Sequence, residues 1–207
     1  MTEPLVWIDC EMTGLDPERD VLVEVAVVVT DSELTLLDDG LDILIATDSA
    51  KLAGMEDVVR EMHTASGLLE ALASATTTLQ EAEDQVLAYV QRWVPERRKA
   101  PLCGNSIATD RTFLTRYMPR LDDHLHYRMV DVSSIKELAR RWYHRAYFNS
   151  PAKTGGHRAL ADIIDSITEL RYYRSTVFVP PPGPDTDASR AAAALAVAPP
   201  PGSVVKD

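Results

Sequence analysis

Apolar residues dominate three short segments in the first quarter of the chain, and each has the length and spacing of a β-strand. Residues 5–12 read LVWIDCEM, residues 21–30 are β-branched almost throughout, and residues 41–45 read LDILI. A strand as rich in valine as 21–30 is expected at the centre of a sheet, where both of its faces are covered. The connections between the three segments are short, which favours an antiparallel meander.

The rest of the folded chain alternates between helical and strand patterns. Residues 79–93 carry apolar side chains at helical spacing, with Val86, Val90 and Trp93 on one face. Further elements are predicted as helices at 55–62, 107–118, 134–143 and 158–174, and as strands at 101–105 and 126–132. This order predicts an α/β fold, with a mixed five-stranded sheet flanked by helices and the first three strands antiparallel.

The last segment of the chain has a different composition. From Pro180 onward lie seven of the 13 prolines and a run of alanines, with few large apolar side chains. Such a segment buries too little surface to offset the entropy lost when it is ordered. We therefore predict a folded domain over residues 1–179 and a disordered Pro/Ala-rich tail over residues 180–207.

Composition and charge narrow the functional classes. The chain has 207 residues and a formal net charge of −11, which argues against a general nucleic-acid coat protein with a basic surface. It holds no apolar run of about 20 residues for a membrane span, and its first residues lack the pattern of a secretory signal. The two cysteines, Cys10 and Cys103, are too few for a disulfide scaffold, so a reducing cytoplasm is the expected compartment.

Two carboxylates interrupt the first predicted strand. Asp9 and Glu11 are two residues apart, so on a strand they project from the same face, while the intervening Cys10 projects into a core. Two partly buried anions side by side repel each other unless a positive charge lies between them. A divalent cation is the usual solution.

Two further carboxylates occupy inward positions of predicted helices. Asp110 lies three residues after Ile107, on the apolar face of helix 107–118, and Asp162 borders the apolar face of helix 158–174. Each aspartate alone is more often a helix cap or a solvated flank than a metal ligand. Four such carboxylates in one domain, without a Cys/His cluster, favour Mg²⁺ or Mn²⁺ over structural zinc.

His157 has the chemistry of a general base. On one continuous helix His157 and Asp162 would lie about 140° apart and could not face the same site. The glycines at 155 and 156 allow the histidine to sit on a loop before the helix, and an imidazole can accept a proton near neutral pH. An isolated histidine is more often structural, but the neighbouring carboxylates favour the catalytic interpretation.

A local excess of positive charge accompanies these groups. Between Arg128 and Arg158 the sequence has seven Lys/Arg against two acidic residues, an excess of five within an acidic chain. The excess fits a solvated helix face or a binding site for a short phosphate-bearing ligand.

Three motifs resemble those of the DEDDh (DnaQ-like) 3′→5′ exonucleases. They are WIDCEMTGLD (7–16), GNSIATDRTFL (104–114) with its N-x4-D spacing, and HRALADI (157–163) with its H-x4-D spacing. The segments MHTASGL (62–68), HYRMVDVSSIKELARRW (126–142) and ELRYYR (169–174) are similar to the oligoribonuclease family within that superfamily. The resemblance covers residues 5–175 and implies an RNase H-like exonuclease fold.

The resemblance also implies an activity. The expected enzyme is a 3′→5′ exoribonuclease that hydrolyses short single-stranded RNA, from dinucleotides up to pentanucleotides, to 5′-phosphomononucleotides, and 5′-phosphorylated dinucleotides would be its best substrates. It would act as a homodimer. Two Mg²⁺ or Mn²⁺ ions would be bound by Asp9, Glu11, Asp110 and Asp162, and His157 would be the base.

The substrate contacts implied by the resemblance come from other segments. Leu15 would wedge between the two bases, His63 would lie beside the substrate, and Tyr127 would reach the partner subunit's site. The terminal 5′-phosphate would be bound by Ser106, Arg128, Ser133 and Lys136. One position departs from the family pattern, because Val58 stands where an aromatic residue is common.

Two alternatives belong beside this hypothesis. A proofreading-type DNA exonuclease of the same superfamily shares the five catalytic residues but not the segments around HYR and MHT. A non-catalytic RNase H-like binding module would usually lack some of the metal-binding carboxylates. Neither the cellular substrate, RNA-decay fragments or linear signalling dinucleotides, nor the preferred metal follows from the sequence.

Overall fold

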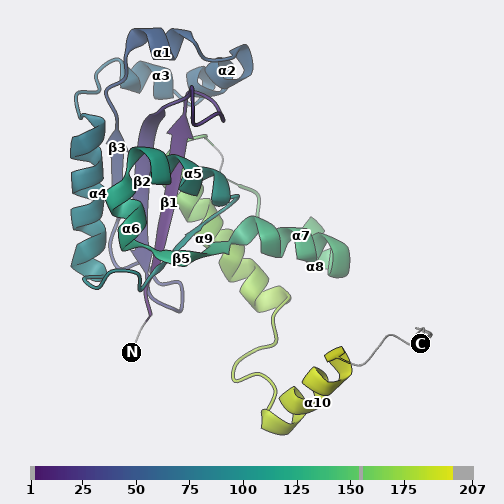
Figure 1. Ribbon diagram of the computed structural model, residues 1–207. Coiled ribbons are helices and arrows are strands. Elements are labelled where there is room, and N and C mark those ends of the chain that lie inside the picture. The colour runs from purple at the N-terminus through teal and green to yellow at the C-terminus, as the bar shows by residue number, and fades with distance from the viewer. Residues whose placement is uncertain (1–2, 154–155, 198–207) are drawn as a thin grey trace, which may run out of the picture.

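A five-stranded mixed sheet forms the centre of the computed structural model, which describes residues 3–153 and 156–197 (Figure 1). The sheet has the strand order β3-β2-β1-β4-β5. Its strands are β1 (Leu5–Met12), β2 (Leu22–Thr30), β3 (Leu41–Leu44), β4 (Pro101–Gly104) and β5 (His126–Asp131). β1 pairs antiparallel with β2, as does β2 with β3, whereas β4 runs parallel to both β1 and β5. The predicted α/β class and the antiparallel arrangement of the first three strands are confirmed.

Ten helices surround this sheet or follow it in the described part of the chain. They are α1 (Ser49–Ala53), α2 (Asp57–Ala65), α3 (Leu68–Leu72), α4 (Leu79–Trp93), α5 (Ala108–Tyr117), α6 (Pro119–His124), α7 (Val132–Trp142), α8 (His144–Phe148), α9 (Ala159–Thr176) and α10 (Thr186–Val197). The predicted bounds of β1 and α4 are confirmed residue for residue, and the other predicted elements end within a few residues of their observed bounds. α1, α3, α6 and α8 were not predicted, because five or six residues are too few to display a helical period.

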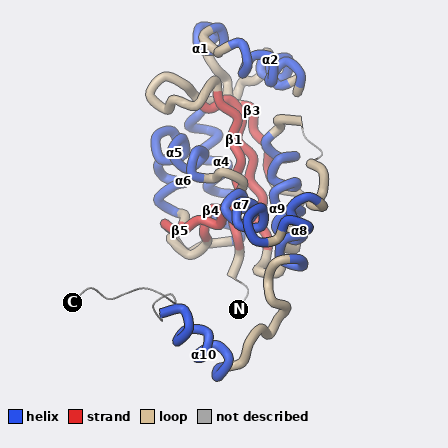
Figure 2. The backbone as a smooth tube through the Cα atoms, turned by 90° about the vertical axis from the view of Figure 1, so that its right-hand side faces the viewer, coloured by secondary structure: helices blue, strands red, loops and turns tan. Residues whose placement is uncertain are grey.

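The two faces of the sheet pack against different helices, and Figure 2 views the sheet edge-on between them. On one face, Val6 and Ile8 of β1 join a buried cluster with apolar side chains of α4, α5 and α6. On the other face, Trp7 joins a cluster formed with α7 and α9. Alternation along β1 therefore directs Asp9 and Glu11, on the Trp7 side, toward the N-terminal end of α9.

The helices α1, α2 and α3 cover the end of the sheet at which β1 terminates (Figure 1). Leu68 and Leu72 of α3 form a small cluster with Val23 of β2. The pairing of β1 with β2 changes register between Glu11 and Met12, which is a β-bulge beside the acidic pair. Bulges often re-aim side chains next to functional sites.

The predicted tail contains one helix in its described part. α10 forms where the chain is rich in alanine, the residue with the highest helix propensity, although the composition predicted disorder. α10 buries no side chain and lies away from the sheet in Figures 1 and 2. Residues 198–207 lie outside the described part, and the domain boundary at 179/180 stays a prediction.

None of the helices in the described part of the chain is both long and apolar enough to cross a bilayer.

Candidate functional site

The two carboxylates of β1 lie together at the end of the strand. Glu11 is buried and Asp9 is partly buried. Burial, and then repulsion from Asp110 and Asp162, holds the pKa of Asp9 well above its ordinary value. Burial, followed by repulsion from Asp162 and Glu24, raises the pKa of Glu11 to about 8. The two side chains therefore carry their negative charge at a considerable electrostatic cost.

Asp110 approaches the same pair from the first turn of α5. As predicted, its side chain points inward, and it is buried. Its Oδ1 accepts a hydrogen bond of 2.9 Å from the backbone N–H of Cys10, between the two β1 carboxylates. Burial raises the pKa of Asp110 to about 7, although the hydrogen bond from Cys10 opposes that change. The Cys10 bond thus ties α5 to the middle of the acidic motif.

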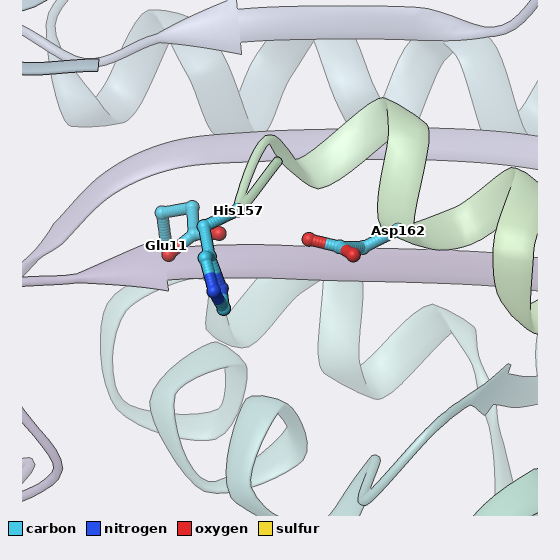
Figure 3. A group of neighbouring side chains, drawn as sticks. All are labelled: Glu11, His157 and Asp162. Carbon is cyan, nitrogen blue, oxygen red and sulfur yellow. The ribbon is translucent and has the colours of Figure 1, made fainter. Parts of the chain in front are cut away.

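Asp162 and His157 approach from the third segment. Asp162 lies in the first turn of α9, and burial, partly offset by the charge of Lys153, raises its pKa. His157 precedes the helix, is exposed, and has a left-handed backbone with φ 48°. One ligand atom each from Glu11, His157 and Asp162 lie within 4.8 Å of one another (Figure 3). We expected His157 to lie outside the helix, where it can approach Asp162, and the structure agrees, since α9 begins at Ala159. Gly155, one of the two glycines expected to allow this, lies outside the described residues.

The donor set fits divalent cations. Four carboxylates from three separate segments gather here, and the pKa of each is raised, so the protonated or cation-bound forms are favoured over four free anions. Carboxylate oxygens are the ligands that Mg²⁺ and Mn²⁺ prefer. The exposed imidazole of His157 lies beside these carboxylates, so it can contact a water molecule without itself binding the cation.

Leu15 stands at the wall of a nearby cavity of about 570 Å³. Its side chain is 75% exposed, and so the structure leaves its apolar surface free to contact a ligand. Val58, in the position where an aromatic residue was expected, lines the same cavity and is 68% exposed. Leu15 and Val58 give this wall of the cavity an aliphatic surface, where an aromatic residue would offer a larger stacking surface.

His63 does not border the open cavity but is fully buried beneath the acidic pair. Its Nε2 lies 2.8 Å from the carbonyl oxygen of Met12, which can only accept, so Nε2 carries the proton. Its Nδ1 lies 3.8 Å from Glu11 Oε2. His63 therefore holds the end of β1 through Met12, while its buried Nδ1 has no hydrogen-bond partner among the described residues.

Two of the predicted phosphate ligands lie side by side. The hydroxyl oxygens of Ser106 and Ser133 are 3.1 Å apart, and Ser133 donates to Asn105 Oδ1 at 3.0 Å. Ser106 has a left-handed backbone with φ 51°, and its N–H donates to Asp131 Oδ1 at 2.9 Å. These hydrogen bonds join the end of β4 to the start of α7.

Lys136 and Arg128 are placed differently from the two serines. Lys136 forms an ion pair of 2.9 Å with the buried Glu169 of α9. The guanidinium of Arg128 lies 5.6 Å from the centre of the Tyr127 ring, and Arg128 lines a separate cavity of about 680 Å³ with Trp93. Tyr127 is 73% exposed on the edge strand β5. The two serines therefore lie together, whereas Arg128 lines another cavity.

Two residues near the site were missed by the sequence reasoning. Glu24 of β2 pairs in register with Glu11 and is fully buried, and Arg158 forms an ion pair with it at 2.6 Å. A signal for Glu24 was present, because an acid in a β-branched central strand is as unexpected as the pair in β1. Nothing in the local pattern identified Arg158 as its partner.

Comparison with known proteins identifies close relatives. The RNase_T family, described as exonuclease, matches residues 6–170. An oligoribonuclease of Streptomyces griseus is 64% identical over 199 residues, which is 96% of this chain and 98% of the relative. An oligoribonuclease of Leifsonia xyli is 60% identical over 95% of this chain and 94% of the relative. One of Mycobacterium sp. (strain KMS) is 56% identical over 100% of this chain and 95% of the relative.

Solved structures with the same fold are more distant in sequence. An exonuclease I of Methylocaldum szegediense matches with a TM-score of 0.59 and 18% identity over 84% of this chain and 41% of that chain. E. coli exonuclease I, in a complex with single-stranded DNA, matches with a TM-score of 0.60 and 15% identity over 84% of this chain and 40% of that chain. The chain spans about two fifths of the length of these exonucleases. At such low identity the likeness shows the fold, an RNase H-like exonuclease fold, as predicted.

Proposed function

The chain belongs to the oligoribonuclease family of exonucleases, and from this premise we propose that it hydrolyses short single-stranded RNA from the 3′ end to 5′-phosphomononucleotides. Its preferred substrates are 5′-phosphorylated dinucleotides. The observation that supports the proposal best is the convergence of Glu11, His157 and Asp162, whose ligand atoms lie within 4.8 Å of one another. A hydrolase for phosphodiester bonds needs such a grouping of cation ligands and a base.

The four carboxylates bind the metal. Two Mg²⁺ or Mn²⁺ ions are assigned to Asp9, Glu11, Asp110 and Asp162, the side chains whose pKa values are all raised. When bound, these ions supply the positive charge that attracts the scissile phosphate and neutralises charge in the transition state. This local charge also explains how a chain with net charge −11 accepts an anion.

His157 is assigned as the general base. It accepts a proton from the water that attacks the scissile phosphorus, and its exposed ring can reach a water above Glu11 and Asp162. Its left-handed backbone is uncommon for a residue other than glycine, as is typical of residues held in place at functional sites.

The substrate contacts are assigned around this centre. Leu15 wedges between the two bases in the cavity that it shares with Val58. His63, which is fully buried in this structure, is assigned beside the substrate, with its Nδ1 3.8 Å from Glu11 Oε2. Ser106 donates its hydroxyl to the terminal 5′-phosphate, and the adjacent Ser133 exchanges its hydrogen bond to Asn105 for one to the phosphate.

Lys136 and Arg128 provide the positive charge of the phosphate pocket. Lys136 reaches the phosphate from its ion pair with Glu169, which is 2.9 Å long. Arg128 reaches it from the edge strand β5, and its fork can make two charge-assisted hydrogen bonds to a phosphate.

Assembly and compartment follow from the same family. The chain acts as a homodimer in which Tyr127 contacts substrate in the partner subunit's site, consistent with the large exposure of Tyr127 on an edge strand. Both cysteines are free and buried, as suits a protein of the reducing cytoplasm. RNA-decay fragments and linear signalling dinucleotides are both short enough for the site.

A substrate comparison tests the function. We expect Mg²⁺- or Mn²⁺-dependent conversion of a 5′-phosphorylated RNA dinucleotide to mononucleotides, followed by liquid chromatography, with slower turnover of a pentanucleotide. Asp162→Asn serves as the inactive control. A preference for a long DNA primer over the RNA dinucleotide would instead assign the chain to the proofreading-type DNA exonucleases.

A further inference from the structure

The carboxylate of Glu24 is a clamp on the beginning of α9. Glu24 is fully buried in the central strand β2. Its Oε1 accepts hydrogen bonds from Arg158 Nε at 2.8 Å and pairs with Arg158 Nη2 at 2.6 Å. Its Oε2 accepts the backbone N–H of Ala159 at 3.1 Å. One buried side chain thereby binds both the side chain of Arg158 and the backbone of the next residue.

This clamp replaces the ordinary cap of the helix. α9 begins at Ala159, and its N-cap residue Arg158 forms no side-chain capping bond. The first N–H groups of a helix need acceptors, and a negative charge there is favoured by the helix dipole. Glu24 supplies both from a strand 134 residues away, so the start of α9 is fixed to the sheet.

His157 comes immediately before this fixed point. Its φ of 48° belongs to the left-handed region, which a residue other than glycine holds only when its surroundings impose it. Arg158 and Ala159, the two residues that follow, are both bound to Glu24. The clamp therefore holds the chain on the C-terminal side of His157 in the conformation that the strained residue requires.

The same clamp is in register with the acidic motif. Glu24 lies directly opposite Glu11 in the pairing of β2 with β1, and Arg158 Nη2 is also 3.8 Å from Asp42 Oδ2. A displacement of the helix start relative to β2 would accordingly change the separation between His157 and Glu11. Small displacements of a base are costly in catalysis, because proton transfer requires hydrogen-bond distance.

We infer that Arg158 and Glu24 are positioning residues for His157, holding its backbone so that the imidazole stays over Glu11 and Asp162. The inference rests on the proposed role of His157 as general base. Arg158 acts through His157 and is assigned no contact with substrate or metal. Its guanidinium is paired with Glu24 and lies 3.8 Å from Asp42 Oδ2.

The chain contains a matched control for the experiment. Glu83 of α4, also buried, accepts Arg120 Nε at 2.8 Å and the backbone N–H of Arg120 at 2.7 Å, at the start of α6. Arg120 Nη2 completes the same fork at 2.6 Å. This second clamp has the same chemistry, but its helix carries no candidate site residue.

The experiment compares the two clamps by steady-state kinetics on a 5′-phosphorylated RNA dinucleotide at saturating Mg²⁺, with melting temperatures measured in parallel. For Arg158→Ala we expect kcat to fall about tenfold to a hundredfold, with KM changed less than about threefold. For Arg120→Ala we expect a comparable loss of melting temperature and an unchanged kcat. Arg158→Lys, which keeps one charged hydrogen bond, should recover part of the lost kcat.

A second arm separates positioning from general destabilisation. In a His157→Ala background, Arg158→Ala should lower the residual rate by less than about twofold, because a residue that acts through His157 has nothing left to position. Arg158→Ala leaves Glu24 buried without its partner, which destabilises the fold. Glu24→Gln/Arg158→Met removes both charges together and should show the same loss of kcat.

Three results would overturn the inference. An unchanged kcat in both Arg158→Ala and Glu24→Gln/Arg158→Met would show that the clamp does not serve catalysis. In that case the proposed function would still stand if the parent were active and His157→Ala inactive. An equal loss from Arg158→Ala with and without His157 would show that Arg158 acts elsewhere. A fully active His157→Ala would remove the base assignment, and the inference with it.

Discussion

Replacing Asp110 by asparagine is expected to stabilise the protein in the absence of divalent ions while it abolishes metal-dependent hydrolysis. Asparagine has nearly the same shape, and its carbonyl oxygen can still accept the 2.9 Å hydrogen bond from Cys10 N–H. What changes is the charge, which in the parent is buried beside Asp9 and Glu11. The variant loses a proposed metal ligand and, with it, a buried charge.

The magnitude follows from the pKa of Asp110. Its folded-state pKa of about 7 lies above the ordinary 3.8, so the folded protein binds this proton more tightly than the unfolded chain does. The stability contributed by the protonated carboxyl is complete below about pH 4 and is lost as the pH rises through about 7. At about 1.4 kcal/mol per pH unit, the ionised carboxyl destabilises the fold by at most about 4 kcal/mol. Burial of the charge causes this shift, and the asparagine amide, which is buried in the same place, recovers only part of it, about 2–4 kcal/mol.

Thermal unfolding in EDTA measures this effect. At about pH 9 the melting temperature of Asp110→Asn should exceed that of the parent by roughly 5–15 °C, and at about pH 4 the two should nearly coincide. Saturating Mg²⁺ should narrow the difference, since only the parent keeps the full ligand set. Asp39→Asn, at an exposed position, is the control and should change little. A variant less stable than the parent at high pH without metal would refute the reasoning.

Three further perturbations test other parts of the assignment. His157→Ala should still bind metal and substrate but lose about 10²–10⁴ in turnover, the usual contribution of a positioned base; unchanged turnover near neutral pH would exclude that role. Removal of all residues after Val179 should leave melting temperature and dinucleotide turnover nearly unchanged, because α10 buries no side chain; a clear loss of either would show that the tail docks. Arg128→Ala should lower turnover of a 5′-phosphorylated dinucleotide several-fold to hundreds-fold, from about 1.5–3 kcal/mol for a charged hydrogen bond, and affect a pentanucleotide much less. Equal losses on the two lengths, measured by single-turnover assay, would contradict a pocket for the 5′-phosphate.

The elements whose patterns are long and regular were predictable from local sequence. The bounds of β1 and α4 agree because strand alternation and helical periodicity depend only on residues a few positions apart. The same local geometry placed Asp9 and Glu11 on one face and Asp110 on the inner side of α5. Short helices such as α8 were not predicted because a single turn shows no helical period. α10 was not predicted because its helix rests on the high helix propensity of alanine and not on a buried apolar face.

The sequence by itself determined which residues make up the candidate site. It identified the four carboxylates on inward-facing positions and the histidine that lies before its helix. The tertiary structure alone decided how distant side chains are paired. It buried His63 behind Glu11 and directed Lys136 to Glu169. It also bound Glu24 to an arginine 134 residues away. Such pairings depend on how whole helices pack on the sheet, and that packing is set by the sum of many apolar contacts, which no single local pattern encodes.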